Sequence, residues 1–151
     1  MPTIFIIGDS TVEDNTPPFR GWGWALKNYV AAGCTVKNYA CSGCSSRSFF
    51  EKGLLDPVEK EIRAGDLLLI QFGHNDGGPI NVGKARGEFP GNNDDKEIMT
   101  IETTGINEGI YSYGWYLRKF CLDAMEKGAT PIILSLTPTN FRDENGKNVR
   151  E

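Results

Sequence analysis

The chain has 151 residues, of which 39% are hydrophobic and 24% charged, a composition typical of one globular domain with a real core. Its formal net charge of -4 gives no electrostatic reason to expect a nucleic acid or an anionic membrane as partner. The longest apolar runs, Ile4–Ile7 and Leu67–Ile70, are too short to cross a bilayer. We therefore predict a single domain over residues 1–151 that binds neither nucleic acid nor a membrane.

The cysteines and the first residues bear on the compartment. Met1 is followed almost at once by the first apolar run, which predicts a cytoplasmic protein if Met1 is native, and a secreted or periplasmic one if a signal peptide was trimmed. Cys41 and Cys44 have the spacing of a metal or redox pair, but zinc needs about four ligands. The only histidine is His74, so we predict free structural cysteines and no metal.

The first expected strand covers residues 3–7 and is apolar on both faces, which places it in the middle of a sheet. It leads directly into Gly8–Thr11, whose sequence Gly-Asp-Ser-Thr predicts a turn that exposes Ser10. We expect Asp9 to stabilise this turn. A polar loop follows, and then a helix is expected from about residue 22 to 32.

Two further strands end in loops that carry polar side chains. The second strand is expected over residues 35–40 and continues into the small-residue loop Cys41–Ser48. A short helix is expected around residues 57–63, and the third strand, over 66–72, leads into the polar turn Gly73–Gly78.

Residues 79–109 are the least regular part of the chain. A loop of this length in a compact domain is typical of a lid or a binding loop. The next strong pattern predicts a helix over 110–127, followed by a fourth strand over 130–136. Residues 141–151 are polar, with a turn expected at Asn145–Gly146.

Strands and helices alternate in this order, which predicts an α/β fold with a parallel sheet. Right-handed crossovers place helices on both faces, so we expect a three-layer α/β/α sandwich with a flavodoxin-like sheet. The expected spatial order of the strands, numbered along the chain, is 2-1-3-4. Because the fourth strand would form an uncovered apolar edge, we expect the chain to be incomplete at its C-terminus, as the N-terminal portion of a longer domain.

Three polar loops meet at the carboxyl edge of this sheet, where open α/β sheets bind their ligands. Ser10 supplies a nucleophile. Gly43 lets a backbone N–H approach a substrate oxygen without a side chain in the way, and the Asn75 amide supplies a second donor. Together with the Ser10 N–H, they predict an oxyanion hole for acyl transfer, in which one such donor lowers the barrier by roughly 3–4 kcal/mol.

The same loops resemble the first three sequence blocks of the SGNH (GDSL) hydrolases, on the branch of rhamnogalacturonan acetylesterase-like carbohydrate esterases. The resemblance extends over the whole chain, and its segments are Gly8–Thr11, Gly21–Gly23, Ala40–Phe49, Gly73–Gly78, Tyr113–Lys119 and Lys127–Ile132. It implies that Ser10 is the catalytic nucleophile and that Gly43 and Asn75 complete the oxyanion hole. It also implies a serine esterase, without cofactor, that removes O-acetyl groups from a pectin-type cell-wall polysaccharide or oligosaccharide.

One signature of that family has no counterpart in this sequence. The family's fourth block, Asp-x-x-His, supplies the base and its orienting carboxylate, and here Asp143 and Glu144 are followed by no histidine. The resemblance puts His74 on the substrate side, so we expect it to bind substrate, although it shares a sheet edge with Ser10. Three explanations stay open: a fragment of a longer esterase, a second chain or self-association that completes the domain, or a relative that only binds acylated glycan.

Alternatives also stay open for individual side chains. Arg47 either touches a uronic carboxylate of the substrate or is a solvated loop charge. Asp76 is expected to brace its own turn. A phosphate binder would share the fold, but Asp9 stands where the phosphate would lie, which favours the hydrolase.

Overall fold

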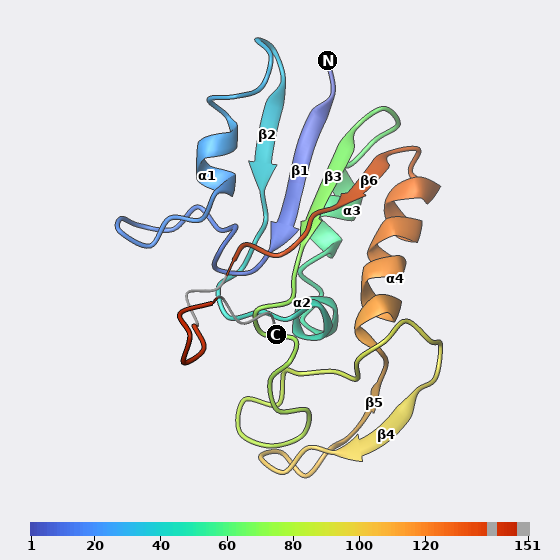
Figure 1. The fold of residues 1–151 in the computed structure, drawn as a ribbon. Coiled ribbons are helices and arrows are strands. Elements are labelled where there is room, and N and C mark those ends of the chain that lie inside the picture. The colour runs from blue at the N-terminus through green and yellow to red at the C-terminus, as the bar shows by residue number, and fades with distance from the viewer. Residues whose placement is uncertain (139–141, 148–151) are drawn as a thin grey trace.

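A computed structural model of the chain describes residues 1–138 and 142–147 (Figure 1). Its main sheet has four parallel strands in the spatial order β2-β1-β3-β6. These are β1 (Thr3–Gly8), β2 (Thr35–Asn38), β3 (Leu67–Gln71) and β6 (Thr130–Ile133). The predicted strand order and parallel direction are confirmed, although β2 and β6 end earlier than expected.

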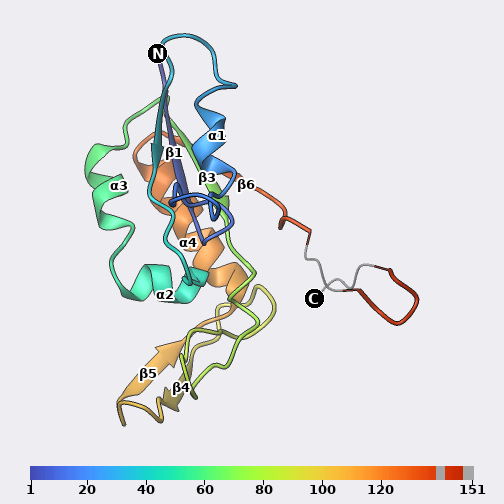
Figure 2. The same ribbon diagram turned by 90° about the vertical axis from the view of Figure 1, so that its left-hand side faces the viewer.

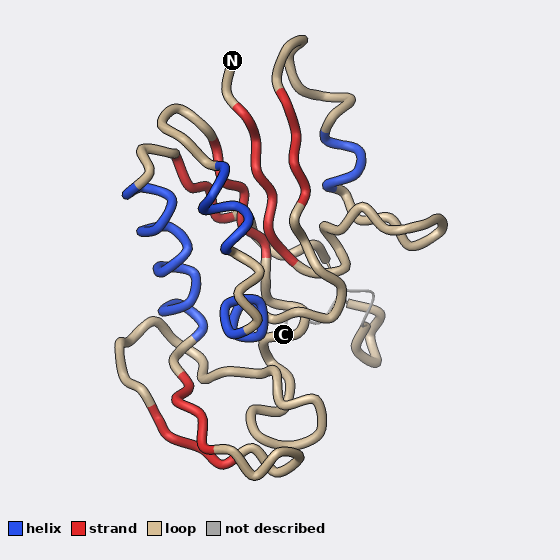
Figure 3. The backbone as a smooth tube through the Cα atoms, turned by 180° about the vertical axis from the view of Figure 1, so that it is seen from behind, coloured by secondary structure: helices blue, strands red, loops and turns tan. Residues whose placement is uncertain are grey.

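Helices cover the two faces of this sheet unequally. Figure 2 shows α1 (Gly23–Leu26) on one side of the sheet and α3 (Asp56–Glu61) on the other. Seen from behind, α2 (Ser46–Glu51) and α4 (Tyr113–Glu126) lie on the same side as α3 (Figure 3). None of the helices in the described part of the chain is long and apolar enough to cross a membrane.

The helix expected over residues 22–32 is wrong in length. After Leu26 the chain continues in tight turns, in which the Asn28 N–H donates to the Ala25 carbonyl and the Tyr29 N–H to the Leu26 carbonyl, each at 2.9 Å. The N-cap, Trp22, makes no side-chain capping bond. An uncapped helix of one turn is marginal, because its nucleation is unfavourable and most of its stability comes from tertiary packing.

The alternation of β1 divides the core between the two faces. On one face, Phe5 and Ile7 join a cluster that α2, α3 and α4 cover, with Phe49 and Phe120 among its fully buried members. On the other face, Ile4 and Ile6 pack with Val12 under α1, the loop before it and the turns that follow it. The sheet is therefore buried on both faces in its centre, as the continuous apolar run of β1 predicts.

The long segment predicted as irregular contains an antiparallel hairpin. It is formed by β4 (Glu97–Thr100) and β5 (Asn107–Ile110). Figure 1 shows the hairpin beyond the carboxyl ends of the main strands, next to α2 and α4. β4 is mostly exposed and β5 buries only its last residue, Ile110, so neither strand shows the alternation of apolar and polar residues by which strands are recognised.

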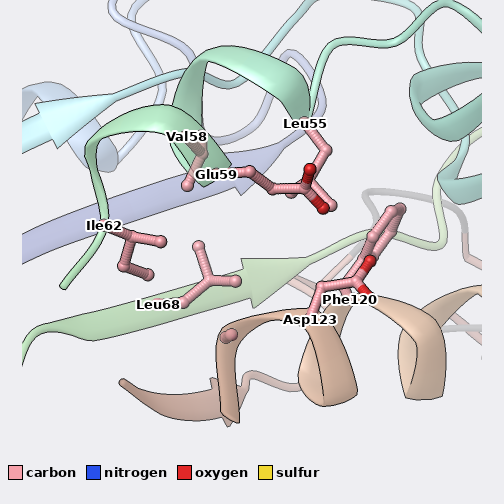
Figure 4. A pocket seen from close by; sticks show the side chains of 8 residues that line it. Leu55, Val58, Glu59, Ile62, Leu68, Phe120 and Asp123 are labelled. Atoms are coloured by element: carbon pink, nitrogen blue, oxygen red, sulfur yellow. The ribbon is translucent and has the colours of Figure 1, made fainter. Parts of the chain in front are cut away.

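A small pocket opens between α3 and α4 (Figure 4). It is lined by apolar side chains together with two carboxylates, namely Leu55, Val58, Glu59, Ile62, Leu68, Phe120, Asp123 and Ala124. Burial, and secondly the nearby Asp123 carboxylate, raises the pKa of Glu59. None of the residues of the three polar loops lines this pocket, so it is a gap in the helix layer rather than a part of the candidate site.

Candidate active site

Ser10 is presented by a tight turn directly after β1. Oδ1 of Asp9 accepts two hydrogen bonds from Thr11, from its backbone N–H and from its hydroxyl, both at 2.8 Å. The Val12 N–H closes the turn on the Asp9 carbonyl at 3.1 Å. Asp9 is fully buried, whereas Ser10 is exposed. The expected role of Asp9 as the carboxylate that organises this turn is confirmed.

The strands come so close together at this point that β1 has to end in glycine. A Cβ on Gly8 would lie 2.5 Å from the Gln71 carbonyl oxygen of β3. On the other side, the Cys41 N–H donates to the Gly8 carbonyl at 2.9 Å. Ser10 lies two residues after Gly8, and Gly43 lies two residues after Cys41. The two loops therefore leave the sheet next to each other.

A hydrogen bond holds Asn75, the third predicted oxyanion donor, against the loop that carries Gly43. Nδ2 of Asn75 donates to the Cys44 carbonyl at 2.8 Å, which fixes the Asn75 amide against the loop that carries Gly43. Gly43 itself has a φ of +75°, in the left-handed region that favours glycine. A side-chain amide has two N–H groups, so the second one is left for a ligand. The structure thus places Gly43 and Asn75 together, and their catalytic role stays a prediction.

His74 lies on the side of the site that faces the loop after β6. Its ring is half-buried, and its Nε2 is 2.8 Å from the Thr137 hydroxyl oxygen. The contact ties the imidazole to a neighbouring loop rather than to its own turn. Its predicted role in substrate binding stays a prediction.

The loop expected over residues 41–48 is wrong at its end, because α2 begins at Ser46. The Ser45 hydroxyl accepts the Ser48 N–H at 3.0 Å, and the Ser48 hydroxyl accepts the Ser45 N–H at 2.9 Å. This is a capping box built from Ser-x-x-Ser. The usual sequence signature has Glu or Gln at the fourth position, so the pattern was a weak signal for a helix start.

Both expectations for Arg47 are wrong, because its side chain is completely buried. The guanidinium donates to Glu51 at 2.8 Å and to Glu108 at 2.6 Å. It also donates to the carbonyls of Ile80 and Gly87, each at 2.8 Å. Arg47 therefore clamps the segment 79–110 onto α2 and has no donor directed at solvent or substrate.

Two carboxyl groups are buried behind the loops of the site. Asp76 accepts the Ser46 N–H at 2.8 Å, and Glu88 accepts the Ser46 hydroxyl at 3.0 Å. Asp76 was expected to brace its own turn, and that expectation is wrong, since it holds the first turn of α2. Burial, and secondly a hydrogen bond with Asp76, raises the pKa of Glu88 to about 10. Glu88 is therefore protonated at neutral pH.

The cysteines next to Gly43 are not arranged for metal binding. All four thiols are free, and Cys44 is buried. Burial, and then the neighbouring Cys44, raises the pKa of Cys41 to about 11, which keeps the thiol protonated. Within residues 1–138 and 142–147, no group of three or more His, Cys, Asp or Glu side chains is placed to hold a metal ion.

Curated proteins of similar sequence are rhamnogalacturonan acetylesterases. The chain is 37% identical to the rhamnogalacturonan acetylesterase of Emericella nidulans over 140 residues, which is 91% of this chain and 54% of the relative. It is 35% identical to the rhamnogalacturonan acetylesterase RhgT of Bacillus subtilis over 147 residues, covering 95% of this chain and 53% of RhgT. The chain is therefore similar in sequence to curated rhamnogalacturonan acetylesterases over most of its own length.

The solved structure of the Bacillus subtilis protein YxiM shows the same fold. It aligns with 95% of this chain and 35% of its own at a TM-score of 0.66 and 26% identity. No protein-family model matches the chain. The chain spans about half the length of the curated acetylesterases it matches.

Proposed function

We propose that this chain carries the nucleophile and the oxyanion hole of a serine esterase that removes acetyl groups from a rhamnogalacturonan-type polysaccharide or oligosaccharide. The observation that supports the proposal most is the position of Asn75, bonded to the Gly43 loop at the sheet edge from which the exposed Ser10 emerges. The names of the related acetylesterases suggest the substrate.

In the proposed reaction, the Ser10 hydroxyl oxygen attacks the carbonyl carbon of the acetyl ester. The developing oxyanion accepts hydrogen bonds from the N–H groups of Ser10 and Gly43 and from the second Nδ2–H of Asn75. The intermediate then expels the sugar oxygen, which takes up the proton that the base removed from Ser10 and leaves as a hydroxyl, and an acetyl group stays on Ser10. Attack by water on this acyl group releases acetate and regenerates Ser10.

The attack also needs a base for the Ser10 proton, and the sequence holds one histidine. His74 is bonded to Thr137, and we assign it to substrate binding. The base is then a histidine from a further stretch of the same protein or from a second chain. Two observations support this: the curated relatives are nearly twice as long, and in the described residues β6 pairs on one side only. Residues 1–151 would accordingly be part of a larger domain.

Acetate release from acetylated rhamnogalacturonan, with and without added imidazole, tests the proposal. Imidazole supplies a free base, so we expect it to accelerate release by the wild-type chain and not by Ser10→Ala. Asn75→Ala should lower the imidazole-dependent rate by roughly 10²–10³-fold, the usual loss for one oxyanion donor. Ser135→Ala removes another exposed serine hydroxyl and is the matched control.

Equal rates for wild type and Ser10→Ala at every imidazole concentration would exclude the esterase mechanism. The single histidine favours one second candidate, a relative that binds acylated glycan without hydrolysing it. That candidate predicts a glycan affinity that Ser10→Ala leaves unchanged, together with no acetate release.

A further inference from the structure

A second arginine, Arg86, lies at the loop that carries Gly43. Its Nη1 donates to the Gly43 carbonyl at 2.8 Å. A Cβ built on Gly43 would be 3.3 Å from the same nitrogen, so the guanidinium lies directly beside this glycine. Arg86 is half-buried, unlike the fully buried Arg47.

The backbone of Arg86 is fixed while most of its guanidinium is left without a partner. Its carbonyl accepts the hydroxyl of Ser45, the cap of α2, and the N–H of Gly87 donates to the Pro79 carbonyl at 2.9 Å. The bond to Gly43 is the one hydrogen bond that the guanidinium makes within the described part of the chain. A guanidinium has five N–H donors, so several remain for a ligand.

Arg86 also makes no ion pair with any carboxylate of the described residues, whereas Arg47 and Arg118 do. The two acidic side chains buried behind this loop, Asp76 and Glu88, form no ion pair with Arg86. Asp76 is engaged with Ser46, and Glu88, with its pKa raised to about 10 by burial and by Asp76, carries a proton at neutral pH. A cation without an ion-pair partner in the described residues, partly buried beside an oxyanion donor, attracts an anionic group of a substrate.

We propose that Arg86 is a specificity-determining residue that binds the carboxylate of a uronic acid in the chain of the acetylated substrate. A planar guanidinium matches a carboxylate with two parallel hydrogen bonds, which a neutral sugar does not offer. This inference rests on the proposed function, since it takes the polysaccharide to be one that contains galacturonate. Arg86 thereby takes the carboxylate-binding role that was one of the two expectations for Arg47.

Isothermal titration calorimetry of the 151-residue chain tests this without relying on turnover. The ligand is a deacetylated rhamnose–galacturonate oligosaccharide, compared with the same oligosaccharide after its carboxyl groups have been reduced to alcohols. We expect the wild type to bind the acidic ligand at least 10-fold more tightly than the reduced one. Arg86→Gln should abolish that difference. Arg86→Lys keeps the charge but cannot form the two parallel hydrogen bonds, so it should retain part of the difference.

Arg63→Gln is the matched control. Arg63 is an exposed arginine at the opposite end of the sheet, before β3, whose Nη1 also donates to a backbone carbonyl, that of Ile62 at 2.8 Å. It should preserve the preference for the acidic ligand. The wild-type comparison of the two ligands stands even if Arg86→Gln does not fold.

Equal affinity of the wild type for both ligands, or no measurable binding of the acidic one, would overturn the proposal. So would a preference that persists in folded Arg86→Gln. Because these outcomes do not depend on Ser10, they are distinct from a failure of the esterase mechanism, which acetate release reports.

Discussion

At the scale of single residues, Asp76 and Glu88 form a buried pair of carboxyl groups. Oδ2 of Asp76 and Oε2 of Glu88 are both buried and find no hydrogen-bond partner in the described part of the chain. Two ionised carboxylates in this position would repel each other at high cost. We infer that Glu88 carries one proton and donates it to Asp76, an arrangement that would satisfy both groups and that agrees with the raised pKa of Glu88. The pair thereby joins the Gly73–Gly78 loop to the segment that follows it.

The shared proton makes stability depend on pH. The pKa of Glu88 is raised from 4.5 to about 10, so between these values the folded chain binds more protons than the unfolded one. The free energy of unfolding should therefore fall as pH rises from 6 to 9, by at most about 1.4 kcal/mol per pH unit for one proton. Glu88→Gln keeps a donor without titrating, and urea unfolding should show a flatter pH dependence for it.

Glu97→Gln, which changes an exposed carboxylate on β4, should keep the pH slope of the wild type. Identical slopes for wild type and Glu88→Gln would mean that Glu88 is ionised in the folded chain and that the shared proton is absent.

The helices and strands were predictable where one local pattern decides them. The apolar run before Ser10 is sufficient to predict a central strand, because few other structures bury four such residues in succession. The hairpin and α2 were not predictable in the same way, since partners far along the chain hold them. Arg47 contacts residues 80, 87 and 108, and nothing in its own neighbourhood in the sequence distinguishes such an arginine from a solvated one.

The same limit applies to the candidate site. Ser10, Gly43 and Asn75 stand at strand ends, so the topology alone predicts that they share an edge. Arg86 lies in the segment without periodicity, and its place beside Gly43 follows only from the folded path of residues 79–88.

We predict that Arg47→Met increases local unfolding of residues 80–110 before it affects the main sheet. The change leaves the carbonyls of Ile80 and Gly87 unpaired and removes the partner of two carboxylates, which should lower the free energy of unfolding by about 3 kcal/mol. Hydrogen exchange should accelerate over residues 80–110 first, with β1 and β3 still protected.

Arg118→Met is the matched control for that experiment. Arg118 pairs with Asp94 on the surface, where an ion pair contributes about 0–1 kcal/mol. If Arg47→Met and Arg118→Met change stability equally, the buried guanidinium is not what holds the segment in place.

At the scale of the whole molecule, the main sheet ends at its β6 edge in exposed apolar side chains. At the β6 edge, Ile132 and Ile133 are 38% and 52% exposed. On the adjacent helix α4, Leu122 and Met125 are 49% and 58% exposed. An apolar edge strand with unpaired backbone groups is a template for pairing with another strand.

This edge predicts that the 151-residue chain associates with itself in solution. Sedimentation velocity over a range of concentrations should show an average mass that rises with concentration. Ile133→Lys places a charge on the edge strand, which should shift the distribution toward the monomer, because a lysine there opposes strand pairing and apolar contact. Ile98→Lys is the matched control, since Ile98 is 64% exposed on β4, in the separate two-stranded sheet. A wild-type chain that stays monomeric, or an equal effect of the two lysines, would show that the β6 edge does not drive association.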